Sequence, residues 1–296
     1  MKTDIYQTIT DKMIKELEAG IIPWHKPWIG VSGNGCISYE TGKPYSLLNQ
    51  YLLNGRAGEW LTYPQVVKAG GRVRKGEHAS MVVFWSFVLK TETVKQYDET
   101  GAEIGEEKKI YKYPVLKSYN VFHIDQCDGV KPKHNNEVVS YDHDPIQEAE
   151  RVVAGYVQRE HDLKLHIYET ARAFYRPSTD EVEVPESRQY KQQAEYYSTL
   201  FHELTHSTGH RSRLNRDGIT KMHFFGDENY SKEELVAEFG ATFLCGICGI
   251  DCEKALKNSA AYIQGWLSAL KNDRKMIVMA AAKAEKAARY ILTGEK

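Results

Sequence analysis

Cysteine is scarce in this sequence, and the few cysteines present do not suggest a disulfide framework. The chain has 296 residues and five cysteines, an odd number that leaves at least one without a partner. This count argues against a small secreted domain held by disulfide bridges and favours reduced thiols. No apolar run approaches the length of a membrane-spanning helix, and the first residues do not resemble a signal peptide. We therefore expect a cytoplasmic protein.

Net charge is also nearly absent. The 39 lysines and arginines are balanced by 40 acidic residues, which gives a formal net charge of −1. This balance does not exclude binding to nucleic acid, but it requires any basic surface to be local. With 42% hydrophobic and 27% charged residues, the composition is that of a soluble globular protein. The length is sufficient for two domains.

The most specific motif is H-E-x-x-H, which runs from His202 to His206. Residues four apart lie on one face of a helix, so the two histidines can bind one metal ion. Glu203 is rotated about 100° from His202, so its carboxylate can face the water that such an ion holds. This arrangement of two ligands and a general base is typical of zinc metalloproteases. It predicts one Zn²⁺ per chain as the cofactor, with another divalent ion as the alternative. The alternative is two helical histidines that flank a glutamate by chance.

A catalytic zinc site takes three protein ligands, so a third ligand must come from elsewhere in the chain. The sequence predicts a second helix over 231–244, with Ser231 as its N-cap. Glu234 and Glu238 lie four apart on this helix and share a face. The run resembles the second motif of glutamate-type zincins, in which the first glutamate binds the metal. We therefore predict Glu234 as the third ligand and Glu238 as the residue that orients a ligand histidine.

Two alternatives compete with this assignment. A capping box between Ser231 and Glu234 would leave Glu238 as the ligand. A third histidine of the metzincin type would have to stand at position 212, where the chain has Ser212. His210 comes two residues too early, so we reject the metzincin pattern.

The N-terminal half shows both helical and strand-like patterns. Apolar residues at helical spacing predict a helix over 4–19, and a second helix is expected to begin near residues 44–49. Strands are predicted over 81–89 and 110–122. We expect the charged segment 91–109 between them to be flexible.

A local basic segment lies in this half, within residues 60–77. The glycines in the segment would let backbone amides approach an anion closely. Trp60 and Tyr63 could stack on bases while the basic side chains contact phosphate. The alternative is a solvated hairpin. The basic residues, which face the single acid Glu77, are Lys68, Arg72, Arg74 and Lys75.

A tryptophan pair lies upstream, where Trp24 and Trp28 flank Lys26 between two prolines. The prolines prevent a regular helix. Tryptophans on such an irregular segment either plug the core or serve as stacking platforms for bases. The residue types alone leave both interpretations open.

Several of these elements together resemble the N-terminal domain of ArdC-type antirestriction proteins, and related domains occur in plasmid primases. The residues that carry the resemblance are Pro23-Trp24-x-x-Pro27-Trp28, Trp60-Leu61-Thr62 with Gln65, Gly70-Gly71, Val73 to Glu77, and Tyr119-x-Val121-Phe122 with Gln126. The pattern usually carries asparagine where this chain has His123. The resemblance implies binding to single-stranded DNA without sequence preference. We assign the DNA contacts to Trp24, Lys26, Trp28, Trp60, Arg72, Arg74 and Lys75.

The second half is predicted to form a metallopeptidase domain. A helix is predicted over 146–159 and a strand over 163–168, followed by a hairpin that brings 172–175 and 181–185 together. In zincins an edge strand beside the H-E-x-x-H helix binds extended substrate by strand addition. We expect residues 181–184 to form this edge, because Pro185 cannot donate a ladder hydrogen bond.

The rest of this half offers weaker signals. The arginine-containing segment 211–229 could contact DNA, order the cleft or act as a lid, although a solvated loop is the simpler interpretation. His223 and Tyr230 are the candidates for an oxyanion donor. Residues 253–292 are expected to form core helices. Buried thiols are favoured over a metal cluster for Cys245, Cys248 and Cys252.

These observations predict an α+β protein with two domains. The N-terminal single-stranded-DNA-binding domain spans residues 1–128, a polar linker spans 129–145, and a zincin-like metallopeptidase domain spans 146–296. One hypothesis is a plasmid antirestriction protein that cuts protein on or near single-stranded DNA, a tethering that resembles SprT-type proteases of DNA–protein crosslinks. The other is a protein that coats incoming DNA and carries a vestigial or self-cleaving site.

Overall fold

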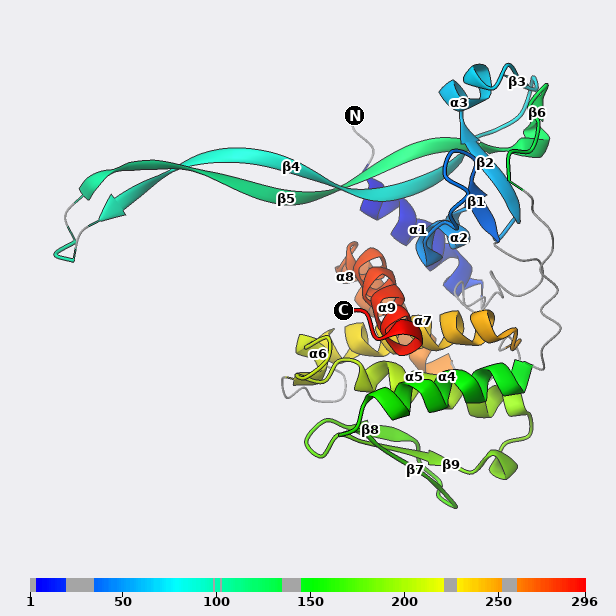
Figure 1. Cartoon of the computed structure of the whole chain (residues 1–296), viewed down its shortest axis with the longest axis vertical. Helices are drawn as coiled ribbons and strands as arrows, with labels where there is room; N and C mark the ends of the chain where they lie inside the picture. The colour runs from blue at the N-terminus through cyan, green and yellow to red at the C-terminus, as the bar shows by residue number, and fades with distance from the viewer. Residues whose placement is uncertain are drawn as a thin grey trace.

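The structure is a computed structural model of the chain. It combines helices with small sheets, which confirms the predicted α+β class (Figure 1). It describes residues 4–19, 35–97, 99–101, 103–134, 145–220, 228–251 and 260–296.

The first helix, α1 (Ile5–Glu18), lies close to its predicted bounds. It begins after Asp4, whose carboxylate accepts hydrogen bonds from the backbone amides of Tyr6 and Gln7. This N-cap satisfies two amides that have no partner within the helix. Ile9 and Met13 share a fully buried face, as their spacing predicts.

The first sheet has four strands in the order β1-β2-β5-β4. A separate short pair joins β3 to β6. The segment of residues 60–77 therefore runs strand, helix, strand and does not form the simple hairpin considered as an alternative. The elements are β1 (Cys36–Ser38), α2 (Leu47–Leu52), β2 (Gly58–Thr62), α3 (Tyr63–Lys68), β3 (Arg72–Val73), β4 (Ser80–Tyr97), β5 (Glu103–His123), the 3₁₀ turn η2 (Ile124–Gln126) and β6 (Cys127–Asp128).

Strands β4 and β5 form a long two-stranded arm that leaves the body of the molecule (Figure 1). Their pairing continues from Ser80 opposite Val121 to Tyr97 opposite Glu103. The prediction of a flexible connection over 91–109 is therefore wrong for most of that segment. In this outer part of the arm, most of the described residues on both faces are exposed. Its sequence therefore lacks the apolar alternation that would have indicated strands.

The C-terminal half contains a three-stranded sheet and most of the helices. Its elements are α4 (Pro145–Arg159), β7 (Lys164–Tyr168), β8 (Phe174–Arg176), β9 (Glu181–Pro185), the 3₁₀ turn η3 (Ser187–Gln189), α5 (Gln193–Ser207), α6 (Asp217–Thr220), α7 (Glu228–Cys248), α8 (Ala260–Asn272) and α9 (Met276–Thr293). Among the described residues, none of the helices is long and apolar enough to cross a membrane.

Strand β9 lies at the centre of the second sheet, whose order is β7-β9-β8. The prediction that residues 181–184 form an edge is therefore wrong. Val182 and Val184 are fully buried, as a central strand requires. Pro185 is only the last residue of β9, where a missing N–H does not prevent pairing on both sides. The strand next to the H-E-x-x-H helix that does lie at an edge is β8.

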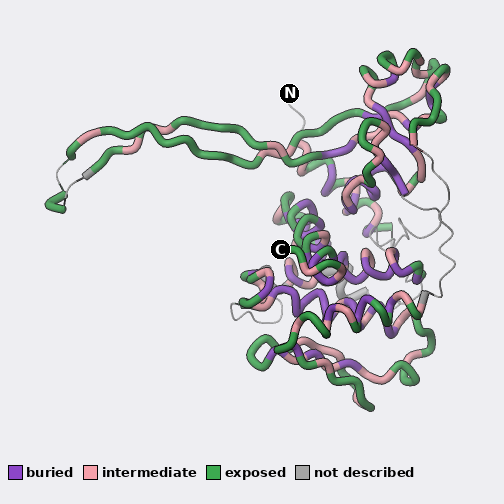
Figure 2. The backbone as a smooth tube through the Cα atoms, viewed as in Figure 1, coloured by how far each residue is buried: buried purple, intermediate pink, exposed green. Residues whose placement is uncertain are grey.

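The hydrophobic core joins the two halves of the chain. One cluster combines Met13 of α1 and Leu52 of α2 with Trp266 of α8 and Ile277 of α9. The tube in Figure 2 is coloured as buried over parts of α1, α2 and the C-terminal helices. A second cluster lies under the H-E-x-x-H helix and is shared by α4, α5, α7, α9 and the second sheet. The N-terminal segment therefore packs directly on the C-terminal helices.

Candidate metal centre

The H-E-x-x-H motif lies on α5, and the buried residues of this helix explain its position. Leu200, Phe201 and Leu204 are almost completely buried in the second core cluster. Their spacing turns His202 and His206 toward α7. The helix therefore presents both imidazoles to one neighbouring element.

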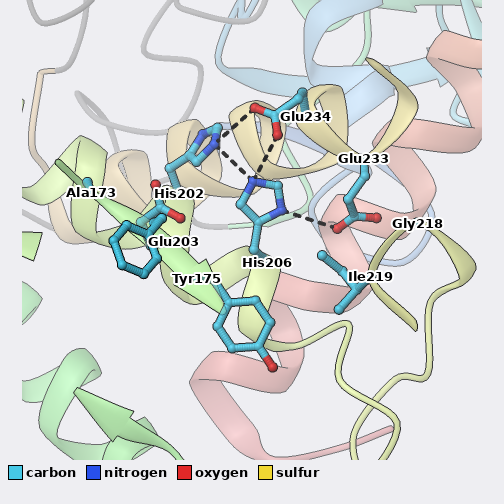
Figure 3. Close-up of a pocket in the computed structure, with 10 residues that line it drawn as sticks. Ala173, Tyr175, His202, Glu203, His206, Gly218, Ile219, Glu233 and Glu234 are labelled. Carbon is cyan, nitrogen blue, oxygen red and sulfur yellow. Dashed lines mark hydrogen bonds and ion pairs between the residues drawn. The ribbon is translucent and has the colours of Figure 1, made fainter. Parts of the chain in front are cut away.

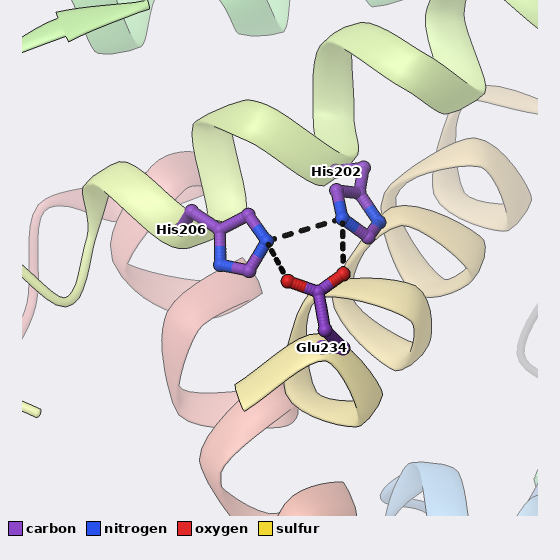
Figure 4. Close-up of side chains that lie close together, drawn as sticks. All are labelled: His202, His206 and Glu234. Carbon is purple, nitrogen blue, oxygen red and sulfur yellow. Dashed lines mark hydrogen bonds and ion pairs between the residues drawn. The ribbon is translucent and has the colours of Figure 1, made fainter. Parts of the chain in front are cut away.

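The two imidazoles and Glu234 converge on one point (Figure 4). The Nε2 atoms of His202 and His206 are 3.1 Å apart. The Glu234 carboxylate oxygens lie 3.5 Å from Nε2 of His202 and 3.4 Å from Nε2 of His206. Zinc bonds of about 2.0–2.1 Å in tetrahedral geometry place ligand atoms about 3.3–3.4 Å apart. The spacing of these three groups therefore fits a tetrahedral metal ion.

Helix α7 delivers Glu234 to this point, but it does not begin where the sequence indicated. It starts at Glu228, so Ser231 lies inside the helix and the predicted N-cap is wrong. The capping-box alternative is wrong for the same reason. Further along α7, a Cβ atom on Gly240 would lie 2.5 Å from a methyl carbon of Thr205 on α5. The absence of a side chain at Gly240 allows the close helix contact that lets Glu234 reach the histidines.

Each histidine has a second carboxylate on its other ring nitrogen. Nδ1 of His202 lies 3.5 Å from Oε1 of Glu238, in the position predicted for a residue that orients the ring. Nδ1 of His206 lies 3.5 Å from Oε1 of Glu233, an ion-pair distance. Arg216 holds Glu233 through hydrogen bonds from Nε and Nη2. Glu233 was not among the predicted site residues, although it stands directly before Glu234 in the sequence.

The charges of this cluster favour a cation. Burial raises the pKa of Glu234, but hydrogen bonds to His202 and His206 outweigh that effect and lower it below the ordinary value. Burial likewise lowers the pKa of His206, while the carboxylates of Glu233 and Glu234 raise it to about 10. Carboxylates gathered around two imidazoles therefore favour positive charge in this cluster. A divalent cation supplies such a charge when the imidazoles are neutral and the carboxylates ionised.

Glu203 lies beside this cluster in a cavity of about 360 Å³ (Figure 3). Its side chain is buried, and this burial raises the pKa of the carboxyl group. Residues 173–175 at the start of β8 form one wall of the cavity, and Ile219 of α6 forms another. The cavity is large enough for part of an extended peptide.

The loop after α5 orders this cleft. Arg213 is almost fully buried and donates to both carboxylate oxygens of Asp180, at 2.9 and 2.6 Å. Arg216 donates to the carbonyl of Thr205 near the C-terminal end of α5. Of the roles considered for this loop, cleft ordering therefore fits these two arginines, whereas a solvated loop does not.

The residues predicted to contact DNA are not all accessible in the structure. Trp60 is buried with only 3% of its surface exposed, and its indole N–H donates to the carbonyl of Arg56. Its prediction as a DNA-stacking residue is wrong in this structure, because β2 places its ring in the core. Trp24, Lys26 and Trp28 lie outside the described residues.

The basic residues of the 60–77 segment are exposed, but the fold brings acids to them. Arg72 pairs with Asp128 at 3.4 Å, and Arg74 pairs with Glu77 at 3.1 Å. Lys75 is also exposed. Asp128 is 56 residues from Arg72 in the chain, so this ion pair could not be predicted from the local sequence. The surface around residues 72–75 therefore carries less positive charge than the count of its basic residues suggests.

Three further predictions concern residues in this half. Cys245 and Cys248 are buried thiols, as expected. Cys252 and His223 lie outside the described residues, and so does the side chain of Tyr230.

The fold and the cluster are those of a zincin-like metallopeptidase domain that follows a mixed N-terminal domain. The family of zincin-like metallopeptidases matches residues 154–283, and the N-terminal domain of the anti-restriction factor ArdC matches residues 3–122. The chain belongs to the family of ArdC-type antirestriction proteins, as the sequence resemblance predicted.

Relatives of different lengths are similar in sequence to this chain. An Escherichia coli protein named DNA primase TraC is 35% identical over the whole chain, and a second TraC is 33% identical. The chain spans only 28% and 20% of these two proteins. The uncharacterized protein y4eC of Sinorhizobium fredii is 32% identical over 98% of the chain and 92% of its own length.

Two crystal structures of the antirestriction protein ArdC from plasmid R388 are similar to this structure. The metal-free form gives a TM-score of 0.71 at 33% identity, covering 99% of this chain and 100% of the other. The Mn(II)-bound form gives the same TM-score and identity over 98% and 97%. A protein of this fold has thus been observed with a divalent metal ion.

Proposed function

We propose that the chain is a metal-dependent peptidase that acts on protein on or near single-stranded DNA, as part of plasmid antirestriction in the cytoplasm. The convergence of His202, His206 and Glu234 carries this proposal, because its spacing suits a tetrahedral ion. Zn²⁺ is the proposed ion, since two imidazoles and one carboxylate are ligands typical of catalytic zinc. The Mn(II) of the R388 protein supports a divalent metal at such a site.

The residues of the chain have separate roles in this proposal. When bound, the metal polarises the scissile carbonyl and lowers the pKa of water. Glu203 accepts a proton from the attacking water and passes it to the leaving amine. Its buried carboxyl group has a raised pKa, which suits proton transfer near neutral pH. Glu233 and Glu238 hold the two imidazoles in the orientation that turns Nε2 toward the ion.

The cleft supplies a place for an extended substrate. Strand β8 forms its wall and lies at the edge of the second sheet, so its outer side can pair with a peptide backbone. The described residues of α6 bound the cavity on another side. A peptide bound between them would place a carbonyl beside the three ligand groups.

Single-stranded DNA is the proposed second partner. The match to the ArdC N-terminal domain supports it, together with exposed basic residues at Arg72, Arg74 and Lys75. Replacing these three with glutamate should weaken binding to all single-stranded sequences alike, because phosphate contacts do not read bases. Wild-type affinity in this variant would remove the basic segment from the proposed site.

A cleavage assay tests the combined proposal. Purified protein is incubated with a DNA-binding protein, either free or bound to single-stranded DNA, with and without a metal chelator. We expect cleavage that requires metal and increases when the substrate protein is on DNA. DNA binding without any cleavage, in protein shown to contain metal, would instead favour the DNA-coating function.

A further inference from the structure

The β4–β5 arm has a surface that the proposed site does not use. We infer that the body-proximal part of one arm face is a binding surface for single-stranded nucleic acid. This inference rests on the proposed DNA-binding function and assigns to it a surface separate from the 60–77 segment. The proximal arm is defined here as residues 80–91 and 110–121, which pair with each other throughout.

The proximal arm has an unusual charge composition. It contains three lysines and no aspartate or glutamate, whereas residues 92–109 contain six acids and three lysines. Lys90 does reach Glu92 at the boundary, at 2.9 Å. The two parts of one continuous ribbon therefore differ in the sign of their charge. The proximal arm therefore attracts a polyanion, whereas residues 92–109, the distal arm, repel it.

Aromatic rings line the same face as two of these lysines. Residues directly opposite each other, and residues two apart in a strand, lie on one face of a β-ribbon. Phe84 lies opposite Lys117, and Lys90 lies opposite Tyr111. Tyr113, opposite Val88, lies between these two pairs on the same face.

These rings are accessible. Phe84 is 45% exposed, Tyr111 38% and Tyr113 42%, although each is a large side chain on a strand. Figure 2 shows exposed backbone along the arm on both strands. A two-stranded ribbon is only marginally stable by itself in water. Exposed rings on such a ribbon therefore suggest a partner that covers them.

Nucleic acid suits this face better than a second copy of the chain. Base rings stack on aromatic side chains while lysines contact phosphate, and this combination tolerates any sequence. The proximal arm extends over about 40 Å, from 12 residues at about 3.4 Å each, enough for several nucleotides. Strand addition by a second copy is disfavoured, because Pro114 within β5 has no N–H to donate and lysines lie along the strands.

Binding of a fluorescent 30-nucleotide oligothymidine to the full chain tests the inference. Tyr111→Ala with Tyr113→Ala should weaken binding on the order of 10-fold for each ring that stacks on a base. The paired Tyr→Phe changes keep the rings and should keep wild-type affinity. Tyr168→Ala is the matched control, since this tyrosine is similarly exposed, at 44%, but lies on β7.

The lysines are tested by salt dependence. Lys90→Gln with Lys117→Gln should reduce the slope of log affinity against log salt by about 1.4, from about 0.7 for each lost phosphate contact. Lys108→Gln with Lys109→Gln removes the same charge from the distal arm and should leave the slope unchanged.

The outcomes separate this inference from the proposed function. Failure of the wild-type protein to bind oligothymidine would refute the DNA-binding function and this surface together. Wild-type binding that survives both proximal variants would overturn only the arm surface. A change from dimer to monomer in the proximal variants, with DNA affinity unaltered, would also overturn it and identify a second copy as the partner. Thermal unfolding of each variant confirms that the fold is retained.

Discussion

The ion pair between Arg213 and Asp180 allows a quantitative prediction about what holds the cleft together. It joins the turn before β9 to the loop after the H-E-x-x-H helix, and both side chains are at least nine-tenths buried. Asp180 also accepts a hydrogen bond from the Tyr175 hydroxyl at 2.8 Å. The Asp180→Asn change removes the charge and retains the shape. The backbone is not disturbed, because asparagine tolerates the positive φ of 52° at this position.

The expected cost follows from the partners that Arg213 keeps. Breaking one side of a buried ion pair costs about 3–5 kcal/mol. Arg213 still donates to Glu160 and to the carbonyl of Ser207, both within 2.9 Å. The free energy of unfolding should therefore fall by about 3 kcal/mol, the lower end of that range. For a chain of this size the melting temperature should fall by about 6–12 °C.

The same pair predicts a dependence on pH. Burial raises the pKa of Asp180, but hydrogen bonds from Arg213 and Tyr175 outweigh it and hold the pKa below its ordinary value. A carboxyl group with a lowered folded pKa stabilises the fold above its unfolded pKa of about 3.9. This contribution is lost as pH falls through the folded pKa. The difference between wild type and Asp180→Asn should thus be full at pH 7 and shrink below about pH 4.

Urea unfolding at several pH values provides the measurement. The control is Glu169→Gln, which removes an exposed pair with Arg188 and should cost no more than about 1 kcal/mol. If Asp180→Asn were as stable as this control at pH 7, the buried pair would not anchor the cleft. A large loss that persisted unchanged at low pH would show that the ionised carboxylate is not its cause.

Two further predictions concern the metal centre. Glu234→Gln should lower metal content more than Glu238→Gln, because only Glu234 contacts both Nε2 atoms, and elemental analysis of the purified variants checks this; equal loss would leave ligand and supporting residue unassigned. Glu233→Gln should lower metal affinity about 10–100-fold in a chelator competition, because it weakens the hold on Nδ1 of His206. Wild-type affinity in Glu233→Gln would show that Arg216 and Glu233 support only the fold.

The sequence predicted the convergence at the metal centre well because helix geometry is local. The four-residue spacings in α5 and α7 place the ligand groups on one face of each helix, whatever the rest of the fold. Glu233 was missed because its role depends on Arg216, which lies 17 residues earlier and reaches it only through the folded loop. The metal-binding role of these residues stays a prediction.

Sheet arrangement was harder to predict because strand order is a long-range property. The central position of β9 follows from its pairing with both β7 and β8, and an ending proline does not reveal it. The burial of Trp60 likewise depends on β5, since Trp60 lies opposite His123 and their rings are in edge contact at 5.1 Å. Residue composition near Trp60 suggested a DNA surface, whereas pairing with a distant strand placed the ring in the core.

The Glu203→Gln variant tests the central claim most directly. Glu203 lies in the cavity beside the ligand groups but is not one of the three that converge, so the variant should retain metal, fold and affinity for single-stranded DNA. The proposed general base is lost, so metal-dependent cleavage of a DNA-bound protein should fall by about 10²–10⁴-fold. Undiminished cleavage by metal-loaded Glu203→Gln protein would contradict the proposed peptidase mechanism.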